Sequence, residues 1–167
     1  MLPGFDSFIF QYSIMTNTYT QLHIQIIFAV KYRSALINPN WKEHLQKYIT
    51  CLIQSNGHKM LQINSLPDHA HILVGMRPMQ SISSLVQTIK SESTKMINYE
   101  KICQSHFSWQ EGFGAFSYSK SQVPEVIRYI QNQEIHHRKE TFIEEYIRIL
   151  KAFDILYDDK YVFKIPE

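Results

Sequence analysis

The chain has 167 residues, of which 44% are hydrophobic and 19% charged, and its formal net charge is +2 at pH 7. These values are typical of one folded domain with its own core, and they exclude a disordered chain. The small net charge does not by itself indicate a nucleic-acid partner, so evidence for one must come from local clusters of basic residues. No apolar run approaches the roughly 20 residues of a membrane-spanning helix. The two cysteines lack metal or redox spacing, which favours reduced thiols in a cytoplasmic protein.

Residues 1–14 differ from the rest of the chain. This stretch, MLPGFDSFIFQYSI, is aromatic but has neither a basic beginning nor a small-residue cleavage site, which disfavours a signal peptide. Regular patterning begins only after Met15. We therefore expect an N-terminal extension over residues 1–14 and a single domain over residues 15–167, with an additional strand or arm as the alternative for the extension.

The first half of the domain predicts a strand, a helix and a hairpin. Apolar residues alternate with mainly polar ones over residues 22–30, as in a strand with one face in the core. The Asn-Pro pair at 38–39 is typical of a helix start, and Gly57 is typical of its end. Residues 59–66 and 69–76 are predicted as two strands joined by a Leu-Pro-Asp turn.

The second half predicts a helix, a strand and further helices. A serine-capped helix is expected over residues 81–97, and a short strand over residues 113–119. The next helix begins near Pro124 and continues through Gln133, and a Thr-Glu capping box opens the last helix, over residues 141–153. The order strand, helix, hairpin, helix, strand, helix predicts an α+β fold, an antiparallel sheet with helices on one face.

Two histidines lie in the third predicted strand. His69 and His71 share a strand face, so both imidazoles can bind one metal ion. Ala70 and Ile72 would face the helices, which leaves the histidines on the opposite face together with Gln25, a face without a predicted covering helix in one subunit. Chance gives roughly 0.4 His-x-His pairs in a chain of this composition. The pair alone is therefore equally well explained as two structural histidines.

A second group of polar residues lies in the predicted helix near residue 130. Tyr129 and Gln133 are four residues apart and share a helix face, while Val126, Ile127 and Ile130 already supply the apolar stripe. A core tyrosine beside a solvated amide is the plain structural alternative. With the two histidines, however, the amide oxygen of Gln133 would complete a metal site, and the phenol of Tyr129 would be the nucleophile.

In order and spacing, these motifs resemble the single-tyrosine HUH transposases of insertion sequences, a superfamily that includes the REP-associated tyrosine transposases. The resemblance extends from about Thr18 to Phe153 and includes the PDHAHILV strand, the WQEGFGAFSYS stretch and the Tyr-Ile-x-Asn-Gln helix. It implies a ferredoxin-like or RRM-like fold in which a late helix carries the catalytic tyrosine. It also implies a homodimer with active sites formed in trans and a cytoplasmic location, on the nucleoid when bound to DNA.

The resemblance further implies a reaction. Single-stranded DNA that forms hairpins at the ends of an insertion sequence would be cleaved and rejoined through a 5′-phosphotyrosine at Tyr129. A divalent metal, Mg²⁺ or Mn²⁺, would be held by His69, His71 and Gln133. No glycine-rich phosphate-binding loop is present in the sequence, so no nucleotide cofactor is expected.

Candidates for DNA contact are basic and imidazole side chains near aromatic residues or on the predicted helices. They are Lys31, Arg33, Lys90, Lys95, His136, His137 and Arg138. Clusters of this kind bind phosphates, and neighbouring aromatic rings can stack on unpaired bases. Each of these residues alone is equally well explained as a solvated surface charge.

Two other functions fit part of the pattern. A non-mobile binder of palindromic DNA or structured RNA that retains the fold would need no nucleophile, so an intact Tyr129 beside the predicted metal ligands argues against it. A zinc hydrolase that uses His69, His71 and another histidine would not explain why Tyr129 and Gln133 occur together.

Overall fold

The computed structural model describes residues 18–34 and 36–162, so the predicted extension over residues 1–14 lies outside the described residues. Four strands form one sheet in the order β2-β3-β1-β4, and every neighbouring pair is antiparallel. The strands are β1 (Leu22–Ala29), β2 (Lys59–Ser65), β3 (His69–Met76) and β4 (Gly114–Tyr118). The predicted α+β class, the antiparallel sheet and the ferredoxin-like order of elements are confirmed.

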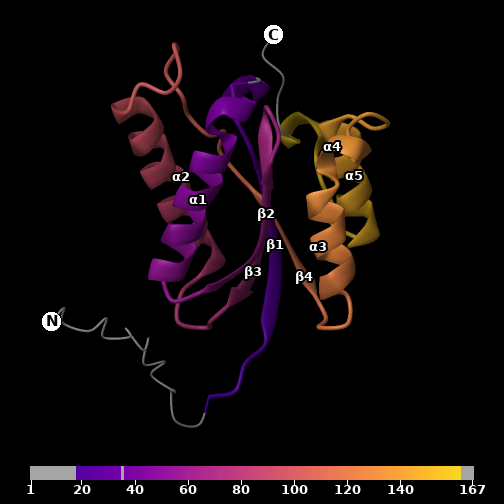
Figure 1. Cartoon of the computed structure of the whole chain (residues 1–167). Coiled ribbons are helices and arrows are strands. Elements are labelled where there is room, and N and C mark those ends of the chain that lie inside the picture. The colour runs from indigo at the N-terminus through magenta and orange to yellow at the C-terminus, as the bar shows by residue number, and fades with distance from the viewer. Residues whose placement is uncertain (1–17, 35, 163–167) are drawn as a thin grey trace, which may run out of the picture.

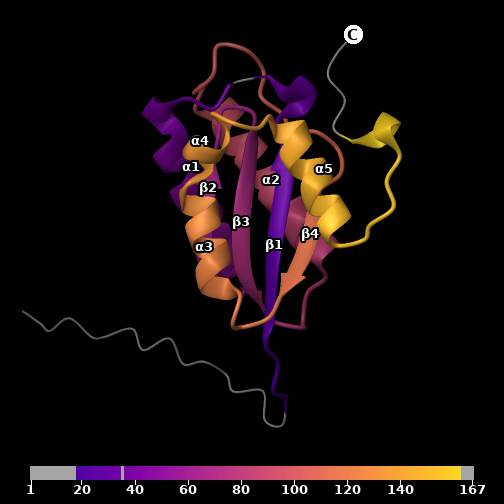
Figure 2. The ribbon, with the colours of Figure 1, turned by 90° about the vertical axis from the view of Figure 1, so that its right-hand side faces the viewer.

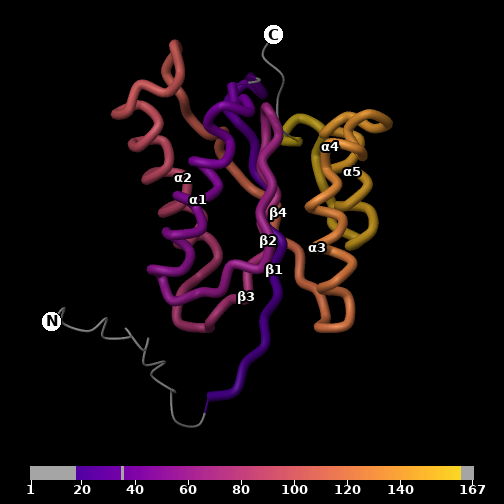
Figure 3. The backbone as a smooth tube through the Cα atoms, viewed as in Figure 1, coloured from indigo at the N-terminus to yellow at the C-terminus, as the bar shows by residue number. Residues whose placement is uncertain are grey.

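Helices cover both faces of this sheet (Figure 1). On one face lie α1 (Pro39–Ser55) and α2 (Ile82–Tyr99), and on the other lie α3 (Val123–Gln131), α4 (Gln133–His136) and α5 (Phe142–Ala152). The backbone trace in Figure 3 shows the same helix–sheet–helix layering. The expectation that the histidine-bearing face has no covering helix in one subunit is therefore wrong. That face also carries large apolar side chains, which need cover: Ile27, Leu73 and Phe116 are almost fully buried there.

The alternation of β3 divides its side chains between the two layers. Ala70, Ile72, Val74 and Met76 belong to the core beneath α1 and α2, as the sequence predicts. The intervening positions pack against the other helical layer, for Leu73 meets α3 and His69 meets α5. Figure 2 shows α3, α4 and α5 over this face of the sheet. One strand thus supplies an apolar surface to one layer and the histidines to the other.

The helix ends follow the predicted signals. The side chain of Asn38 accepts a hydrogen bond from the backbone N–H two residues on, at 3.0 Å, and Ser81 accepts one from the N–H three residues on, at 3.1 Å. Thr141 and Glu144 form the expected capping box. Gly57 follows α1 with a φ of +84°, a conformation that glycine adopts without strain. None of the described helices is long and apolar enough to cross a membrane.

The helix predicted to run from Pro124 through Gln133 is broken. α3 ends at Gln131 and α4 begins at Gln133, and Asn132 between them has φ −97° and ψ 20°. Asparagine is a weak helix former because its side chain competes with backbone hydrogen bonds, and this favours a break here. Tyr129 and Gln133 therefore lie in two different helices.

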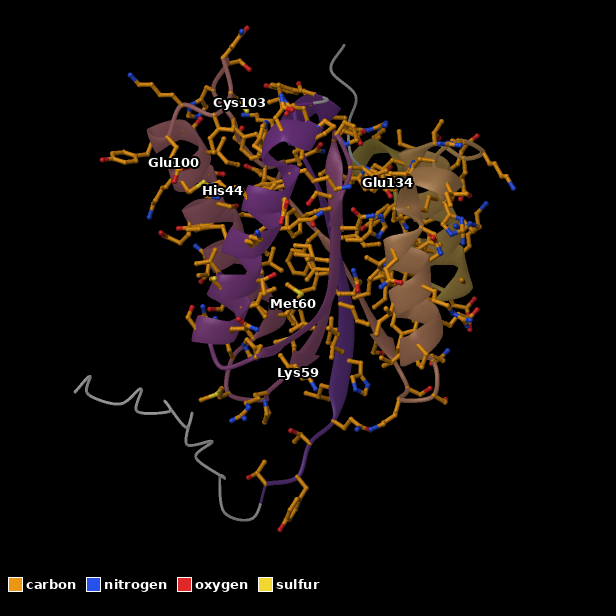
Figure 4. All side chains as sticks on the ribbon, viewed as in Figure 1. His44, Lys59, Met60, Glu100, Cys103 and Glu134 are labelled. Carbon is orange, nitrogen blue, oxygen red and sulfur yellow. The ribbon has the colours of Figure 1, made fainter. Side chains whose placement is uncertain are left out.

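Strand β2 anchors this break. The Asn64 Nδ2 donates hydrogen bonds to the carbonyl oxygen of Ile130 at 2.9 Å and to Oε2 of Glu134 at 3.2 Å. Lys42 of α1 forms an ion pair with Glu134, which Figure 4 labels on the α4 side of the sheet. Because α1 and α4 lie on opposite faces, these contacts connect the two helical layers around the β2 edge.

Replacing Asn64 with Ala should loosen this attachment. The substitution leaves the carbonyl of Ile130 at the helix break without its donor, so we expect a loss of about 1–3 kcal/mol in the free energy of unfolding. Urea denaturation followed by circular dichroism measures this loss. The control is Gln62→Ala on the same strand, which should change stability by less than about 0.5 kcal/mol. Equal stability of the two variants would contradict the anchoring role.

Candidate active site

Strand β3 positions two buried imidazoles beneath α3, α4 and α5. His69 is 1% exposed and His71 is fully buried, and their ring centroids lie 5.1 Å apart. They share the face opposite to α1 and α2, as expected from their spacing along a strand. The Nε2 atoms of both residues are buried and have no hydrogen-bond partner.

A relay of charged groups orients His69. Its Nδ1 lies 2.7 Å from Oδ1 of Asp68, and the other carboxylate oxygen of Asp68 is 3.2 Å from Arg33 Nη2. Burial lowers the pKa of His69 to about 4, although the hydrogen bond with Asp68 acts in the opposite direction. At neutral pH the ring therefore donates from Nδ1 to Asp68 and leaves the Nε2 lone pair free. The ring of Phe142 stacks on this imidazole with centroids 4.0 Å apart.

A second relay lies behind His71. Nε2 of Gln25 is 3.1 Å from His71 Nδ1, and the Tyr118 hydroxyl donates to Oε1 of Gln25 at 2.9 Å. If His71 is to bind a metal through Nε2, its proton must sit on Nδ1, and the Gln25 amide must then turn its oxygen toward the ring. Gln25 can serve either tautomer because its amide carries a donor at one end and an acceptor at the other.

Tyr129 and Gln133 face the two histidines from α3 and α4. The Tyr129 hydroxyl donates to Oε1 of Glu145, and the Tyr129 ring centroid lies 6.2 Å from that of His71. Gln133 is fully buried, and its Nε2 donates to the same Glu145 oxygen at 2.9 Å. Its Oε1 is buried without a hydrogen-bond partner. One chain therefore brings together the four residues that the sequence singles out.

Glu145, which sequence reasoning missed, lies at the centre of these contacts. It is 1% exposed, and its Oε2 lies 3.0 Å from His137 Nε2 and 3.4 Å from His71 Nε2. A signal for it was present in the sequence, because Glu145 lies on the apolar face of the last helix with Phe142 and Ile149. We name the whole set the polar cluster; its members are His69, His71, Tyr129, Gln133, His137 and Glu145.

The charges in the polar cluster shift the pKa values of its two acidic groups, Glu145 and Tyr129, in opposite directions. Burial alone would raise the pKa of Glu145, but His137 and His71 hold it below its ordinary value, so the side chain is a carboxylate. Burial, followed by the negative charge of Glu145, raises the pKa of Tyr129. Arg148 opposes this effect, with Nη2 3.2 Å from the phenol oxygen. Tyr129 is thus a neutral phenol held between a carboxylate and a guanidinium.

The polar cluster has the donors of a metal site. His69, His71, His137 and Glu145 each offer one ligand atom, and these atoms all lie within 4.8 Å of one another. Unpartnered buried atoms are rare in folded proteins, and they mark positions where a bound ion can complete the set. Three such atoms belong to this cluster: Nε2 of His69, Nε2 of His71 and Oε1 of Gln133.

Three of the predicted DNA-contact residues lie on the surface. Lys31 is exposed, with Nζ 5.3 Å from the ring centroid of Tyr32. Lys95 pairs with Glu92 at 2.7 Å on the exposed side of α2, and Arg138 is exposed beyond α4. These three side chains are available to a phosphate backbone.

The other predicted DNA-contact residues make contacts within the chain. Arg33 pairs with Asp68. Lys90 donates to the backbone carbonyls of Gln110 and Gly112, and burial lowers its pKa to about 8. The His136 ring packs against that of Tyr129 at 4.9 Å between centroids, and His137 belongs to the polar cluster. These groups hold loops and the cluster in position, and the geometry does not direct them outward.

The chain is similar to a characterised transposase in sequence. It is 24% identical over 125 residues to the ISDra2 transposase TnpA of Deinococcus radiodurans, a match that covers 72% of this chain and 87% of that protein.

Two solved structures have the same fold. A crystal structure of a protein assigned as a transposase from Deinococcus radiodurans R1 has a TM-score of 0.57 and 21% identity, and the match covers 70% of this chain and 94% of the other. A REP-associated tyrosine transposase bound to a REP hairpin also has a TM-score of 0.57, with 16% identity over 90% of this chain and 91% of the other.

Residues 18–133 match the family model of IS200-like transposases. The matched segment is more than half of the chain and contains His69, His71, Tyr129 and Gln133, whereas His137 and Glu145 lie beyond it. The chain therefore belongs to the IS200-like transposase family.

Proposed function

We propose that this protein cleaves and rejoins single-stranded DNA through a covalent 5′-phosphotyrosine bond to Tyr129. The observation that carries the proposal is the polar cluster, in which a phenol lies beside two buried imidazoles whose Nε2 atoms have no hydrogen-bond partner, although that of His71 is 3.4 Å from Oε2 of Glu145. A core tyrosine would have no need of a carboxylate on one side of its hydroxyl and a guanidinium on the other. Tyrosine is a weak nucleophile unless neighbouring groups assist it; here Arg148 places a positive charge beside the phenol oxygen, and Glu145 offers an acceptor for its proton.

The proposed substrate is DNA that folds into hairpins at the ends of an insertion sequence. A hairpin-bound transposase among the solved structures supports this choice, because its match covers 90% of this chain. Family membership supports the same class of substrate.

The reaction follows from the groups around the phenol. The Tyr129 oxygen attacks phosphorus while the bond between phosphorus and the 3′-oxygen breaks. The phenol proton passes to Oε1 of Glu145, to which the hydroxyl already donates, and the leaving 3′-oxygen takes up a proton from water. Arg148 stabilises negative charge on the phenol oxygen. Attack by another 3′-hydroxyl reverses these steps and rejoins strands without ATP, because the phosphotyrosine conserves the phosphodiester energy.

In this proposal His69, His71 and Gln133 hold a divalent metal through their unpartnered atoms. Two imidazoles and an amide oxygen suit Mn²⁺ better than Mg²⁺, which prefers oxygen ligands. When bound, the ion supplies positive charge to the phosphate oxygens. The relays through Asp68 and Gln25 orient the two imidazoles, as hydrogen-bonded partners do behind metal-binding histidines.

Substituting Tyr129 with Phe should abolish the covalent adduct. Wild-type protein incubated with a single-stranded hairpin and Mn²⁺ should form a protein–DNA species stable to denaturing electrophoresis, and Tyr129→Phe should form none. Tyr99→Phe, at an exposed position on α2, is the matched control and should form the adduct normally. An adduct in Tyr129→Phe would assign the nucleophile elsewhere, and hairpin binding by wild-type protein without any adduct would indicate a non-cleaving binder.

A surface hollow near Lys31 is the proposed path for unpaired DNA. It has a volume of about 490 Å³ and combines basic and aromatic side chains, among them Lys31, Tyr32, Trp109, Lys160 and Tyr161. Tyr32 is 56% exposed and Tyr161 is 81% exposed, so both rings are open to a base. Basic grooves with exposed aromatic rings bind single strands by phosphate contact and stacking.

Tyr161→Ala should weaken the binding of single-stranded DNA. Loss of one stacked base costs about 1–3 kcal/mol, so the dissociation constant should rise about 5- to 150-fold. Fluorescence anisotropy with a labelled oligonucleotide measures the change. Tyr99→Ala, which removes a similarly exposed ring that does not line the hollow, should leave the affinity within about twofold; equal losses in both variants would contradict the proposed path.

The resting arrangement that we propose is a cis site. The family resemblance implies a trans site in a homodimer, and the sequence permits it only if one sheet face is left uncovered in each subunit. Here α3, α4 and α5 cover that face, and Tyr129 shares Glu145 with His71 of the same chain. Exchange of the tyrosine helix between two subunits stays a prediction.

Mixing two inactive variants separates the arrangements. Tyr129→Phe and His69→Gln subunits should each be inactive, and in a cis arrangement their mixture should stay inactive because neither chain has a complete site. Adduct formation by the mixture would show that the tyrosine of one chain serves the histidines of another. Native mass spectrometry reports whether mixed dimers are present.

A further inference from the structure

His137 and Glu145 add two strong ligand groups to the polar cluster. Both lie beyond the family-matched residues 18–133, and both come from the C-terminal side of the break at Asn132. Their side chains are directed inward: His137 Nε2 is 3.0 Å from Oε2 of Glu145, and the His137 ring centroid is 4.7 Å from that of His69. Surface charges of a DNA-binding segment would instead point to solvent.

The two oxygens of Glu145 have different neighbours. Oε1 accepts hydrogen bonds from Tyr129 and Gln133, whereas Oε2 faces the imidazoles of His137 and His71. Oε2 is therefore on the side of the free Nε2 atoms. The carboxylate connects the tyrosine to the histidines.

We propose that His69, His71, His137 and Glu145 form a four-ligand site for a divalent transition metal of the Zn²⁺ type. Three imidazole nitrogens and one carboxylate oxygen are a donor set that zinc prefers, and four protein ligands are typical of closed zinc sites. The four ligand atoms lie within 4.8 Å of one another, and tetrahedral zinc with such ligands separates them by about 3.3 Å. Side-chain movements of about an ångström bring the set to that geometry.

The buried relays favour this site over solvated histidines. The Nδ1 of His69 is bonded to Asp68, and its buried Nε2 has no hydrogen-bond partner. A neutral imidazole with one nitrogen fixed and the other free is the form that binds metals. The inference rests on the same two histidines as the proposed function, but it needs no DNA and no strand cleavage.

The proposed four-ligand site differs from the His69, His71 and Gln133 set in how many coordination positions of the metal it leaves open to substrate. Four protein ligands leave little room for phosphate, so an ion held this way is in a resting state. Release of Glu145 would free a position for substrate. Zn²⁺ at this site should therefore bind tightly without DNA, and the proposed Mn²⁺-dependent cleavage can be measured separately.

Zinc affinity of the full chain tests the proposal directly. Competition with a chromophoric chelator in the absence of DNA should give one tight Zn²⁺ site per chain. Glu145→Gln and His137→Gln should each weaken it by at least about tenfold. Substituted Co²⁺ should give the intense visible absorption of four-coordinate cobalt, and both variants should lose it.

The matched controls come from another His–Glu pair. His44 Nε2 lies 3.0 Å from Glu100 Oε2 on the exposed surface of α1 and α2, and Figure 4 labels both residues. His44→Gln and Glu100→Gln should leave zinc affinity within about threefold.

Three results would overturn the proposal: absence of a tight zinc site, unchanged affinity in folded His137→Gln and Glu145→Gln, or a loss in Gln133→Ala without one in Glu145→Gln. Circular dichroism checks folding, and His137→Gln is the milder of the two ligand variants because the His137 side chain is 16% exposed and that of Glu145 is 1% exposed. Adduct formation with Mn²⁺ is a separate readout, so failure of the zinc site and failure of strand cleavage are distinguishable.

Discussion

A carboxylate buried between a sheet and its covering helices must be compensated, and that requirement governs the C-terminal half of this protein. Removing an ionised group from water costs several kcal/mol unless donors surround it. Glu145 meets the requirement with partners from β3, α3 and α4 and from the turn that follows α4. Each of those elements must therefore be correctly docked before the carboxylate is satisfied. The polar cluster is therefore complete only when the layer formed by α3, α4 and α5 is packed on the sheet.

The apolar residues of α5 make that docking possible. Phe142 stacks on His69, and Tyr146 and Ile149 pack against β1 and β4. Gly114 of β4 is required at this contact, because a Cβ at that position would lie 2.8 Å from the Tyr146 ring. Close packing thus fixes the distance of α5 from the sheet and its rotation about its own axis. These two quantities determine where the carboxylate of Glu145 lies.

Much of the fold follows from local patterns. The period of two in β1 and β3, the caps at Asn38 and Ser81 and the capping box at Thr141 are short-range features, and each forms as predicted. The shared face of the two β3 histidines follows from strand geometry alone. Tyr129 and Gln133 approach the histidines even though the predicted continuous helix is broken between them.

What the patterns did not predict depends on tertiary packing. The period of a helix shows that it has an apolar face, but it does not show which face of the sheet the helix will cover. Helical periodicity alone therefore does not predict where α3 and α5 pack. The sequence makes His137 a candidate for DNA contact because it lies beside His136 and Arg138. Its inward direction depends on Glu145, which lies in another helix. A buried acid within an apolar stripe was the one local sign of this contact.

The register of the β2–β3 hairpin has a consequence for how the family can vary. The backbone N–H of Leu66 bonds to the carbonyl of His69 at 2.8 Å, and this tight turn sets which β3 residues face each layer. One residue inserted or deleted there would turn both imidazoles into the apolar layer and put Ala70 and Ile72 in their place. A change in the length of this turn would therefore disrupt the site even if every side chain of the hairpin were kept.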